Sequence, residues 1–560
     1  MKNNHEEGVM PGSSASNDNQ LVMPGSTRHP VTGPEQAPHW IAGRARNDKE
    51  VARNDNVALA LRSVALAVSV ALTGCAVGPR YDAPPAVDMP MAFKEGGGEW
   101  VAAAPADGVD RGTWWTAFND PLLNDLAARV DVSNQTVAAA VASYAQARAL
   151  VAQQRAGLFP SVTLDGSANR SGTRGGSGGS TSVSTTSSTG TTGTTVVSSG
   201  SGGARNSFQL GIGGSWEPDV WGRLSAGVNA ATASQQASFA DLASARLSAQ
   251  GELAVNYFNL RSLDVQADIA RRTVAGYERT VTITSNRYNA GVVARTDLLQ
   301  AQSQLASARA DLLDVQRQRA QLEHAIAVLV GQVPASFSLK AEPTWAGSVP
   351  TVPLELPSTL LQRRPDIAAA ERRVAQANEQ IGIARSAYFP SLRLSGSVGA
   401  GAAAIGDLFS ASALVWSLGA SAAQTLFNAG LTRAQVESAQ ASFQGAVAQY
   451  RQSVLTAFQG VEDQLAATRI LGEQLALRQE ASQAADLVEQ QVLNRYQSGQ
   501  VAFTEVITAQ NTAQQARRAL VQLQASRQVA AVSLVQALGG GWQGLGAEGS
   551  AQTAPAKTGS

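Results

Sequence analysis

The sequence is nearly free of the residues that most often build catalytic and metal centres. It has one cysteine and four histidines in 560 residues. A single cysteine, Cys75, excludes an internal disulfide framework and a multi-cysteine metal site. Three of the histidines precede Cys75, and only His324 follows it, within an apparent helix. We therefore expect no histidine-based catalytic centre, no bound metal and no cofactor.

Charge and aromatic side chains are also scarce. Charged residues make up 15% of the chain, and 43 basic residues balance 43 acidic ones, so no electrostatic surface for nucleic acid is expected. Aromatic residues make up only 5%, whereas alanine and glutamine are abundant, which favours long helices over an ordinary mixed core. A literal G-x-S-x-G at 175–179 lies in a Ser/Thr/Gly tract without a partner histidine, so the sequence gives no sign of an enzyme.

The start of the chain has the pattern of a secretory signal. The apolar run Val64–Ala71 is well short of the roughly 20 residues that a helix needs to span a membrane. The basic residues Lys49, Arg53 and Arg62 lie ahead of this run. Leu72-Thr73-Gly74-Cys75 resembles a bacterial lipobox, which implies cleavage before Cys75 and lipid attachment to that residue. The alternative is a buried cysteine in an apolar helix.

A short turn occurs twice and marks an internal duplication. Residues 287–291 read RYNAG and residues 495–499 read RYQSG, 208 positions later, and the surrounding sequence repeats in the same register. Each glycine suits the end of a helix that must leave the right-handed region. A duplication of this size predicts one duplicated body rather than several unrelated domains.

The repeat divides the chain into six predicted segments. They are a polar extension with signal peptide (1–74), an anchor and N-terminal segment (75–120), a first repeat (121–331), a Pro-rich linker (332–357), a second repeat (358–539) and a tail (540–560).

Four strands are predicted, two in each repeat. A helical pattern breaks at Pro160 and again at Pro390, and apolar and polar residues alternate strictly after each proline and on the returning segments near Trp216 and Trp416. Each strand has the length of a tilted membrane strand, and Ser, Thr, Arg and Gly on the second face suit a water-filled lumen. Four strands are too few for a barrel, and an open edge cannot face lipid, so two or three copies must combine.

Long helices account for most of the remainder. No proline interrupts 224–289 or 431–497, and each run would extend about 100 Å as one helix. Apolar residues step by three and four from Phe443 to Leu465, as in a coiled-coil seam. Shorter helices over 296–330 and 365–388 would pair with the long ones. The predicted fold is therefore an internally duplicated α+β membrane protein.

Three stretches, taken in this order, resemble one known family. They are CAVGPRYDAPP (75–85), WWTAFNDPLLNDL (114–126) and LLQRRPDIAAAERRVAQANEQIGIARSAYFPSL (360–392). They are similar to the outer-membrane efflux proteins, and more narrowly to the NodT-like lipoprotein branch of the TolC-like channels. The resemblance implies a homotrimer in which four strands per protomer complete a twelve-stranded outer-membrane β-barrel and the helical hairpins form a periplasmic α-barrel.

The resemblance also implies partners and a location. The chain would be lipid-anchored in the outer membrane, with its tunnel in the periplasm. It would serve as the passive exit duct of a tripartite efflux system for drugs or other small solutes. Its partners would be a periplasmic adaptor, an inner-membrane pump of the resistance-nodulation-division type and outer-membrane lipid. Alternatives are a periplasmic coiled-coil adaptor or scaffold lipoprotein, and the exit duct of a type I protein secretion system.

In TolC-like proteins, the far end of the helices meets the adaptor and holds the channel shut. The residues that match this motif are Arg287, Tyr288, Gly291, Arg495, Tyr496 and Gly499. Asp297 and Glu505 follow just beyond, each after a threonine. They would form an acidic constriction of the bore, or would simply begin helices, with the threonine as N-cap and the acid near the positive end of the helix dipole.

Overall fold

The computed structural model describes residues 77–82, 93–95, 111–172, 204–345, 347, 349–350 and 364–540. The chain divides into two compact units, Met1–Leu72 and Thr73–Ser560, and every described residue belongs to the second. The predicted signal peptide, Cys75, the Ser/Thr/Gly tract and most of the tail lie outside the described residues. The six-segment division of the chain stays a prediction.

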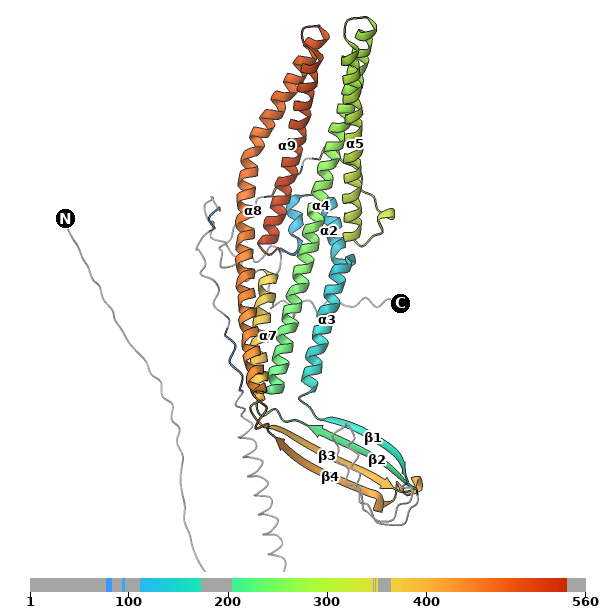
Figure 1. The fold of residues 1–560 in the computed structure, drawn as a ribbon, viewed down its shortest axis with the longest axis vertical. Helices are drawn as coiled ribbons and strands as arrows, with labels where there is room; N and C mark the ends of the chain where they lie inside the picture. The colour runs from blue at the N-terminus through green and yellow to red at the C-terminus, as the bar shows by residue number, and fades with distance from the viewer. Residues whose placement is uncertain are drawn as a thin grey trace, which may run out of the picture. The chain divides into compact units, whose positions relative to one another are not determined.

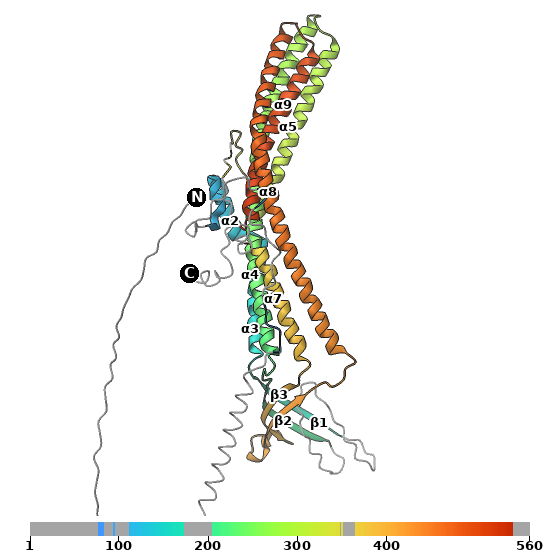
Figure 2. The same cartoon turned by 90° about the vertical axis from the view of Figure 1, so that its left-hand side faces the viewer.

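Two pairs of antiparallel helices dominate the described unit (Figures 1 and 2). Helices α4 (Arg223–Asn289) and α8 (Leu431–Gln497) have 67 residues each, and α5 (Arg295–Leu329) and α9 (Phe503–Ala537) have 35 each. The predicted long helices are thus confirmed to within a residue or two at their ends. At the usual rise per residue, α4 and α8 each extend about 100 Å.

Shorter helices cover the parts of α4 and α8 nearest the sheet. Helix α3 (Gln135–Ala156) packs on α4, and α7 (Pro365–Ser386) packs on both α4 and α8. Helix α2 (Pro121–Ser133) follows the 3-10 helix η1 (Arg111–Phe118) and also contacts α4. The Asn134 side chain accepts hydrogen bonds from the first backbone N–H groups of α3, which explains the sharp break between α2 and α3.

A four-stranded antiparallel sheet follows the proline breaks. Its strands are β1 (Ser161–Ser171), β2 (Arg205–Trp216), β3 (Ser391–Ala402) and β4 (Leu414–Ala423), in spatial order β1-β2-β3-β4. Both predicted hairpins are confirmed. Short 3-10 helices, η3 (Ile405–Asp407) and η4 (Ala411–Ala413), connect β3 to β4.

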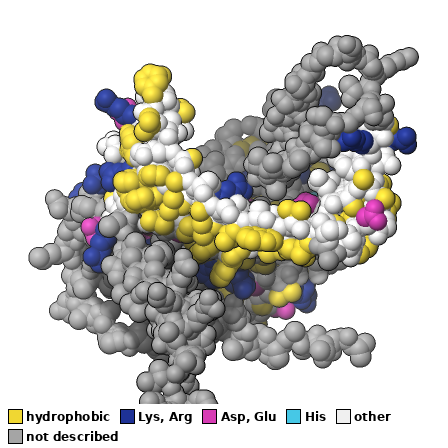
Figure 3. All heavy atoms as spheres, turned by 90° about the horizontal axis from the view of Figure 1, so that it is seen from below, with side chains coloured by type: hydrophobic (Ala, Val, Ile, Leu, Met, Phe, Trp, Pro, Cys, Tyr) yellow, Lys and Arg dark blue, Asp and Glu magenta, His cyan; other side chains and the backbone are white. Residues whose placement is uncertain are grey.

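The register of the sheet separates an apolar face from a polar one. Leu164, Ile212, Val398 and Trp416 pair in one row across all four strands, and all of them are exposed in this chain. Figure 3 shows hydrophobic side chains gathered in a band at this end of the molecule. On the other face, serine hydroxyls bond across strands, with 3.0 Å between the Oγ atoms of Ser161 and Ser215 and 2.8 Å between those of Ser397 and Ser417.

The two outer strands of the sheet each have one free edge. Strand β1 pairs only with β2, and β4 pairs only with β3, within the described part of the chain. A free strand edge presents unpaired backbone N–H and C=O groups, so the sheet is built to continue into another strand at both sides.

The helical core follows the predicted seam on α8. Tyr450, Val454, Val461 and Leu465 are buried in a cluster with residues of α7 and α9, and Phe458 packs beside them. On α5, Ile326 and Ala327 are fully buried, and the buried positions nearer the tip are Ala301, Ala308 and Val315, whereas Leu298 and Leu305 are only half-buried. Small side chains allow the closest approach between helices, so the alanines occupy the contact line.

No helix in the described ranges combines the length and the hydropathy that crossing a membrane as a helix would require.

Candidate functional site

Both RYxxG turns end their helices in the same way. Gly291 and Gly499 adopt φ angles of 74° and 78°, in the left-handed region that glycine tolerates best. The N–H of the residue after each glycine donates to a carbonyl five residues back, from Val292 to Arg287 at 2.8 Å and from Gln500 to Arg495 at 2.9 Å. This is a Schellman motif, and it explains why the last position of each turn is glycine.

The two tyrosines of the turns lie in different environments. Tyr496 is 2% exposed, whereas Tyr288 is 37% exposed. The Tyr496 ring packs against Phe503 with 5.5 Å between centroids, in a cluster with Ala301 and Val506. The same motif therefore yields one buried and one accessible tyrosine.

Arg287 joins the first turn to the second. Its Nη1 donates to the backbone carbonyl of Tyr496 at 2.6 Å, and its guanidinium carbon lies 4.8 Å from the centre of the Tyr496 ring. The hydroxyls of Tyr496 and Thr284 are 3.4 Å apart, and either can be the donor. We call these contacts the Arg287–Tyr496 clamp. The clamp fixes the tip of α8–α9 to the tip of α4–α5.

A second set of polar contacts holds the hairpins together further from the tip. The Tyr277 hydroxyl donates to Asn511 Oδ1 at 3.3 Å, and Gln304 Nε2 donates to the same oxygen at 2.7 Å. Arg518 on α9 pairs with Asp311 on α5 at 3.2 Å. Burial raises the pKa of the Tyr277 phenol, so this hydroxyl remains a donor.

The sequence reasoning missed the Tyr277 contacts. The sequence did contain a signal for these contacts. The position of Tyr277 in the first repeat is occupied by Ala485 in the second, so the two repeats differ there.

The predicted threonine N-caps of α5 and α9 are wrong. The N-cap residues are Ala294 and Ala502, and neither has a side chain that can accept a backbone hydrogen bond. The acids nevertheless lie in the first helical turn, as expected, where the dipole favours negative charge. Asp297 is half-buried, and Glu505 is exposed.

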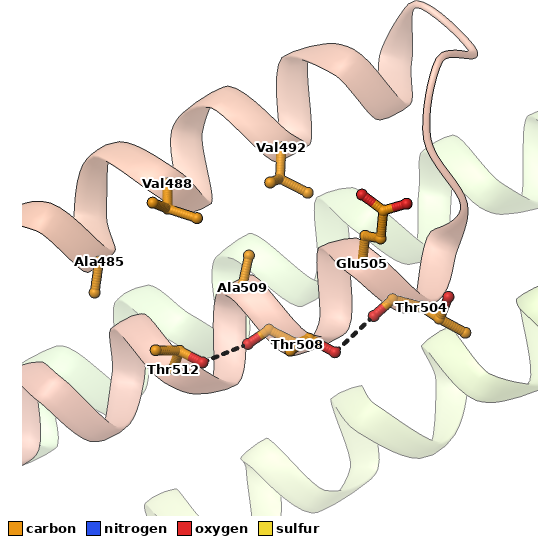
Figure 4. Close-up of a pocket in the computed structure, with 8 residues that line it drawn as sticks. All are labelled: Ala485, Val488, Val492, Thr504, Glu505, Thr508, Ala509 and Thr512. Atoms are coloured by element: carbon orange, nitrogen blue, oxygen red, sulfur yellow. Dashed lines mark hydrogen bonds between the residues drawn. The ribbon is translucent and has the colours of Figure 1, made fainter.

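A groove runs between α8 and α9 just below their turn. It has a volume of about 400 Å³ and is lined by Ala485, Val488, Val492, Thr504, Glu505, Thr508, Ala509 and Thr512. Figure 4 shows the α8 side chains pointing towards α9 and Glu505 at the end near the turn. The hydroxyls of Thr508 and Thr512 donate to carbonyls one turn earlier, at 2.9 Å each, so the groove offers few free polar groups besides Glu505.

A buried ionic network lies at the opposite end of α5 from the tip. The side chains of Arg261 and Asp264, 2% and 0% exposed, pair at 2.9 Å, and Arg319 pairs with Asp264 at 2.6 Å. Both arginines also donate to backbone carbonyls of the linker, Arg319 to Leu339 and Arg261 to Lys340. The network fastens the described start of the linker to α4 and α5.

The described ranges hold no group of three or more His, Cys, Asp and Glu side chains arranged to bind a metal ion. His324 lies exposed on α5.

The sheet and the helical hairpins define an outer-membrane channel of the TolC-like class, and comparison with solved structures agrees. The outer-membrane channel OprN matches with a TM-score of 0.73 and 28% identity, over 84% of this chain and 100% of that chain. The open-state MtrE outer-membrane channel of Neisseria gonorrhoeae matches with a TM-score of 0.69 and 28% identity, over 83% and 98%.

The chain belongs to the outer membrane efflux protein family, whose model matches residues 126–332 and 356–540. It is 32% identical over 448 residues to the pyoverdine export outer membrane protein OpmQ of Pseudomonas aeruginosa, covering 79% of this chain and 90% of that protein. It is 29% identical over 482 residues to the cation efflux system protein CusC of Escherichia coli, covering 85% and 98%. The family consists of channel proteins rather than enzymes.

Proposed function

We propose that three copies of this outer-membrane efflux channel assemble into one exit duct. The observation that carries the proposal is the sheet, which has one apolar face, one polar face and two free edges. Lipid cannot satisfy the free backbone groups of an edge, so β1 of one copy must pair with β4 of another. Three copies of a four-stranded sheet supply twelve strands, enough to enclose a water-filled bore.

The long helices continue this bore into the periplasm. Each of the two hairpins of a copy extends well beyond the sheet, and α4 and α8 each extend about 100 Å. Six hairpins from three copies would form the wall of an α-helical tunnel.

The tip is the proposed gate and the docking site for a periplasmic adaptor. The Arg287–Tyr496 clamp holds the two hairpins of a copy together, which supports a closed resting state. Asp297 and Glu505 would face the narrow end of the bore as an acidic constriction. An inner-membrane pump of the resistance-nodulation-division type would supply the energy for export.

Lipid attachment at Cys75 is part of the same proposal. The first described residues lie along α7: Asn378 Nδ2 donates to the Pro79 carbonyl at 3.0 Å, and Gly78 packs backbone to backbone on Gly382. Gly382 lies four residues before the end of α7, after which the chain enters β3. A lipid three residues before Gly78 would therefore be held at the sheet end of the helices, where the membrane begins.

Cargo would be chosen by the inner-membrane pump rather than by the duct. The names of the relatives refer to pyoverdine export, cation efflux and antibiotic efflux, all in the same family. We propose drugs or other small solutes as the cargo of this chain.

Deletion of the gene tests the proposal. In a strain without a redundant duct, deletion should raise the accumulation of a pump substrate, and the wild-type gene should restore export. Unchanged accumulation would contradict the exit-duct function. Loss of a secreted protein without any change in small-solute export would indicate a type I secretion duct. A protein that shows no heat-modifiable barrel behaviour on gels would indicate a periplasmic scaffold lipoprotein.

A further inference from the structure

The apolar face of the sheet carries a single charged side chain within the four described strands. On β1, alternate residues share this face, from Val162 and Leu164 to Arg170 near the end of the strand. The remaining charged residues of the strands lie out of phase with these rows, on the polar face: Asp165, Arg205 and Arg393. Arg170 is therefore the one ionic group that these strands would present on the lipid-facing side of the proposed barrel.

Arg170 lies at the rim of the apolar face that is farther from the helices. The register pairs it with Asn206 across β1 and β2, and the next row inward is apolar, with Ala168 beside Phe208. The opposite rim, next to the helices, has Trp216. The strand from Asn206 to Trp216 would extend about 33 Å, or about 25 Å across the membrane at the usual tilt of a barrel strand. That matches the height of the apolar band of a membrane barrel, so Arg170 and Asn206 lie where the band ends.

Both polar side chains of this rim are exposed, and the described residues include no hydrogen-bond or ion-pair partner for either. Pairing of β1 with β4 of a second copy uses backbone groups, so it leaves the Arg170 side chain on the lipid-facing side. A guanidinium carries a full charge and five donors, and taking such donors out of water without an acceptor is costly. An anionic group of the membrane surface is the acceptor that this position favours.

We propose that Arg170 and Asn206 bind the phosphate group of a phosphorylated glycolipid in the outer leaflet of the outer membrane. The planar guanidinium matches two oxygens of one phosphate, and the Asn206 amide can donate to a third oxygen or to a sugar hydroxyl. The chain enters β1 from α3, so the far rim faces the outer leaflet, and phospholipids of the periplasmic leaflet stay about 25 Å away. The inference rests on the proposed assembly, which gives three such sites per duct.

The site lies beside the joint between copies. Strand β1 is an edge strand, and its proposed neighbour is β4 of a second copy. On β4, Leu414 and Trp416 share the apolar face and are 61% and 73% exposed. Acyl chains of a glycolipid held at Arg170 would cover this surface of the neighbouring strand, so the lipid would brace the joint between copies.

Lipid binding by the full-length trimer tests this site. Native mass spectrometry follows titration with lipid A that carries two phosphates, with dephosphorylated lipid A and with phosphatidylglycerol. Arg170→Gln removes the charge, and Arg170→Lys keeps the charge without the planar fork. Arg393→Gln removes a charge from the polar face and is the matched control. Heat-modifiable migration on gels shows that each variant folds.

Wild-type trimers should take up to three lipid A molecules, and Arg170→Gln should weaken this binding about tenfold. The Arg170→Lys trimer should fall between the two, and Arg393→Gln should match wild type. Dephosphorylated lipid A should bind the wild-type trimer about as weakly as lipid A binds Arg170→Gln, a comparison that does not depend on the folding of any variant.

Equal binding of lipid A by wild type and Arg170→Gln would show that this arginine is merely solvated, and the inference would be wrong. Phosphatidylglycerol that binds as tightly as lipid A, or displacement of lipid A by inorganic phosphate at equal concentration, would assign the site to another source of phosphate and also overturn it. In each of these cases, trimers that conduct in bilayers leave the exit duct standing. Absence of trimers and of channel conductance would overturn the proposed function as well.

Discussion

At the scale of single residues, the contact between the two hairpin tips depends on an arginine more than on the tyrosine hydroxyl. Arg287 makes both a charge-assisted hydrogen bond and a contact with a ring face, whereas the hydroxyls of Tyr496 and Thr284 meet only at 3.4 Å. A hydrogen bond from a charged donor contributes about 1.5–3 kcal/mol, and a neutral one about 0.5–1.5 kcal/mol.

Arg287→Ala should therefore loosen the tip and raise single-channel conductance in planar bilayers several-fold, whereas Tyr496→Phe should have a small effect. Arg272→Ala, on the same helix, removes only a surface ion pair with Asp268 and serves as the control. Wild-type conductance of the Arg287→Ala channel would place the gate elsewhere.

Residue-scale detail was the part of the site that sequence alone could not supply. The RYxxG motif identified both turns, but the motif has the same tyrosine in both repeats. That tyrosine is buried in the second repeat (Tyr496) and exposed in the first (Tyr288). The difference comes from neighbours in space, since Tyr496 meets Phe503 whereas the counterpart of Phe503 in the first repeat is Arg295. The Thr296 and Thr504 caps were wrong because each helix begins one residue before its threonine.

At the scale of elements, sequence reasoning succeeded because each element follows a local rule. The proline-free runs predicted the bounds of α4 and α8, and the strict alternation of apolar and polar residues after Pro160 and Pro390 predicted the strands. What it could not supply was which side chains join the two hairpins, because the contacts of Tyr277 and Arg518 depend on how the two repeats lie beside each other.

The effect of replacing a glycine on stability should depend on where in the helix that glycine lies. Gly499→Ala places a Cβ at φ 78° and should cost roughly 1–2 kcal/mol. Gly472→Ala, in the middle of α8 with no atom within 4 Å of the added Cβ, should stabilise that helix by about 0.5–1 kcal/mol. Thermal unfolding followed by circular dichroism, with hydrogen exchange near residue 499, measures both effects. Equal effects of the two substitutions would rule out the Schellman turn as the reason for Gly499.

At the scale of the whole molecule, the two faces of the sheet should tolerate charge differently. Leu418 belongs to the apolar face and is 84% exposed, and Ser417 belongs to the polar face beside it. Arginine on a lipid-exposed face costs about 2–4 kcal/mol near the bilayer midplane. Leu418→Arg should therefore reduce the yield of heat-modifiable trimers in the outer membrane, whereas Ser417→Arg should leave it near wild type. A larger loss of trimers with Ser417→Arg than with Leu418→Arg would show that the polar face, not the apolar one, contacts lipid.

The hydrogen bonds between serine side chains on the polar face affect how a solute would pass through the proposed duct. Ser161 with Ser215 and Ser397 with Ser417 direct hydroxyls at each other, and glycines occupy many of the positions between them. In the proposed duct, a solute that reaches these rows of the wall would meet serine hydroxyls that already bond each other and glycines without side chains, whereas Gln209 and Arg393 lie in other rows of the same face. Residence on such a wall is short, so release to the exterior would need neither a release signal nor a change of affinity.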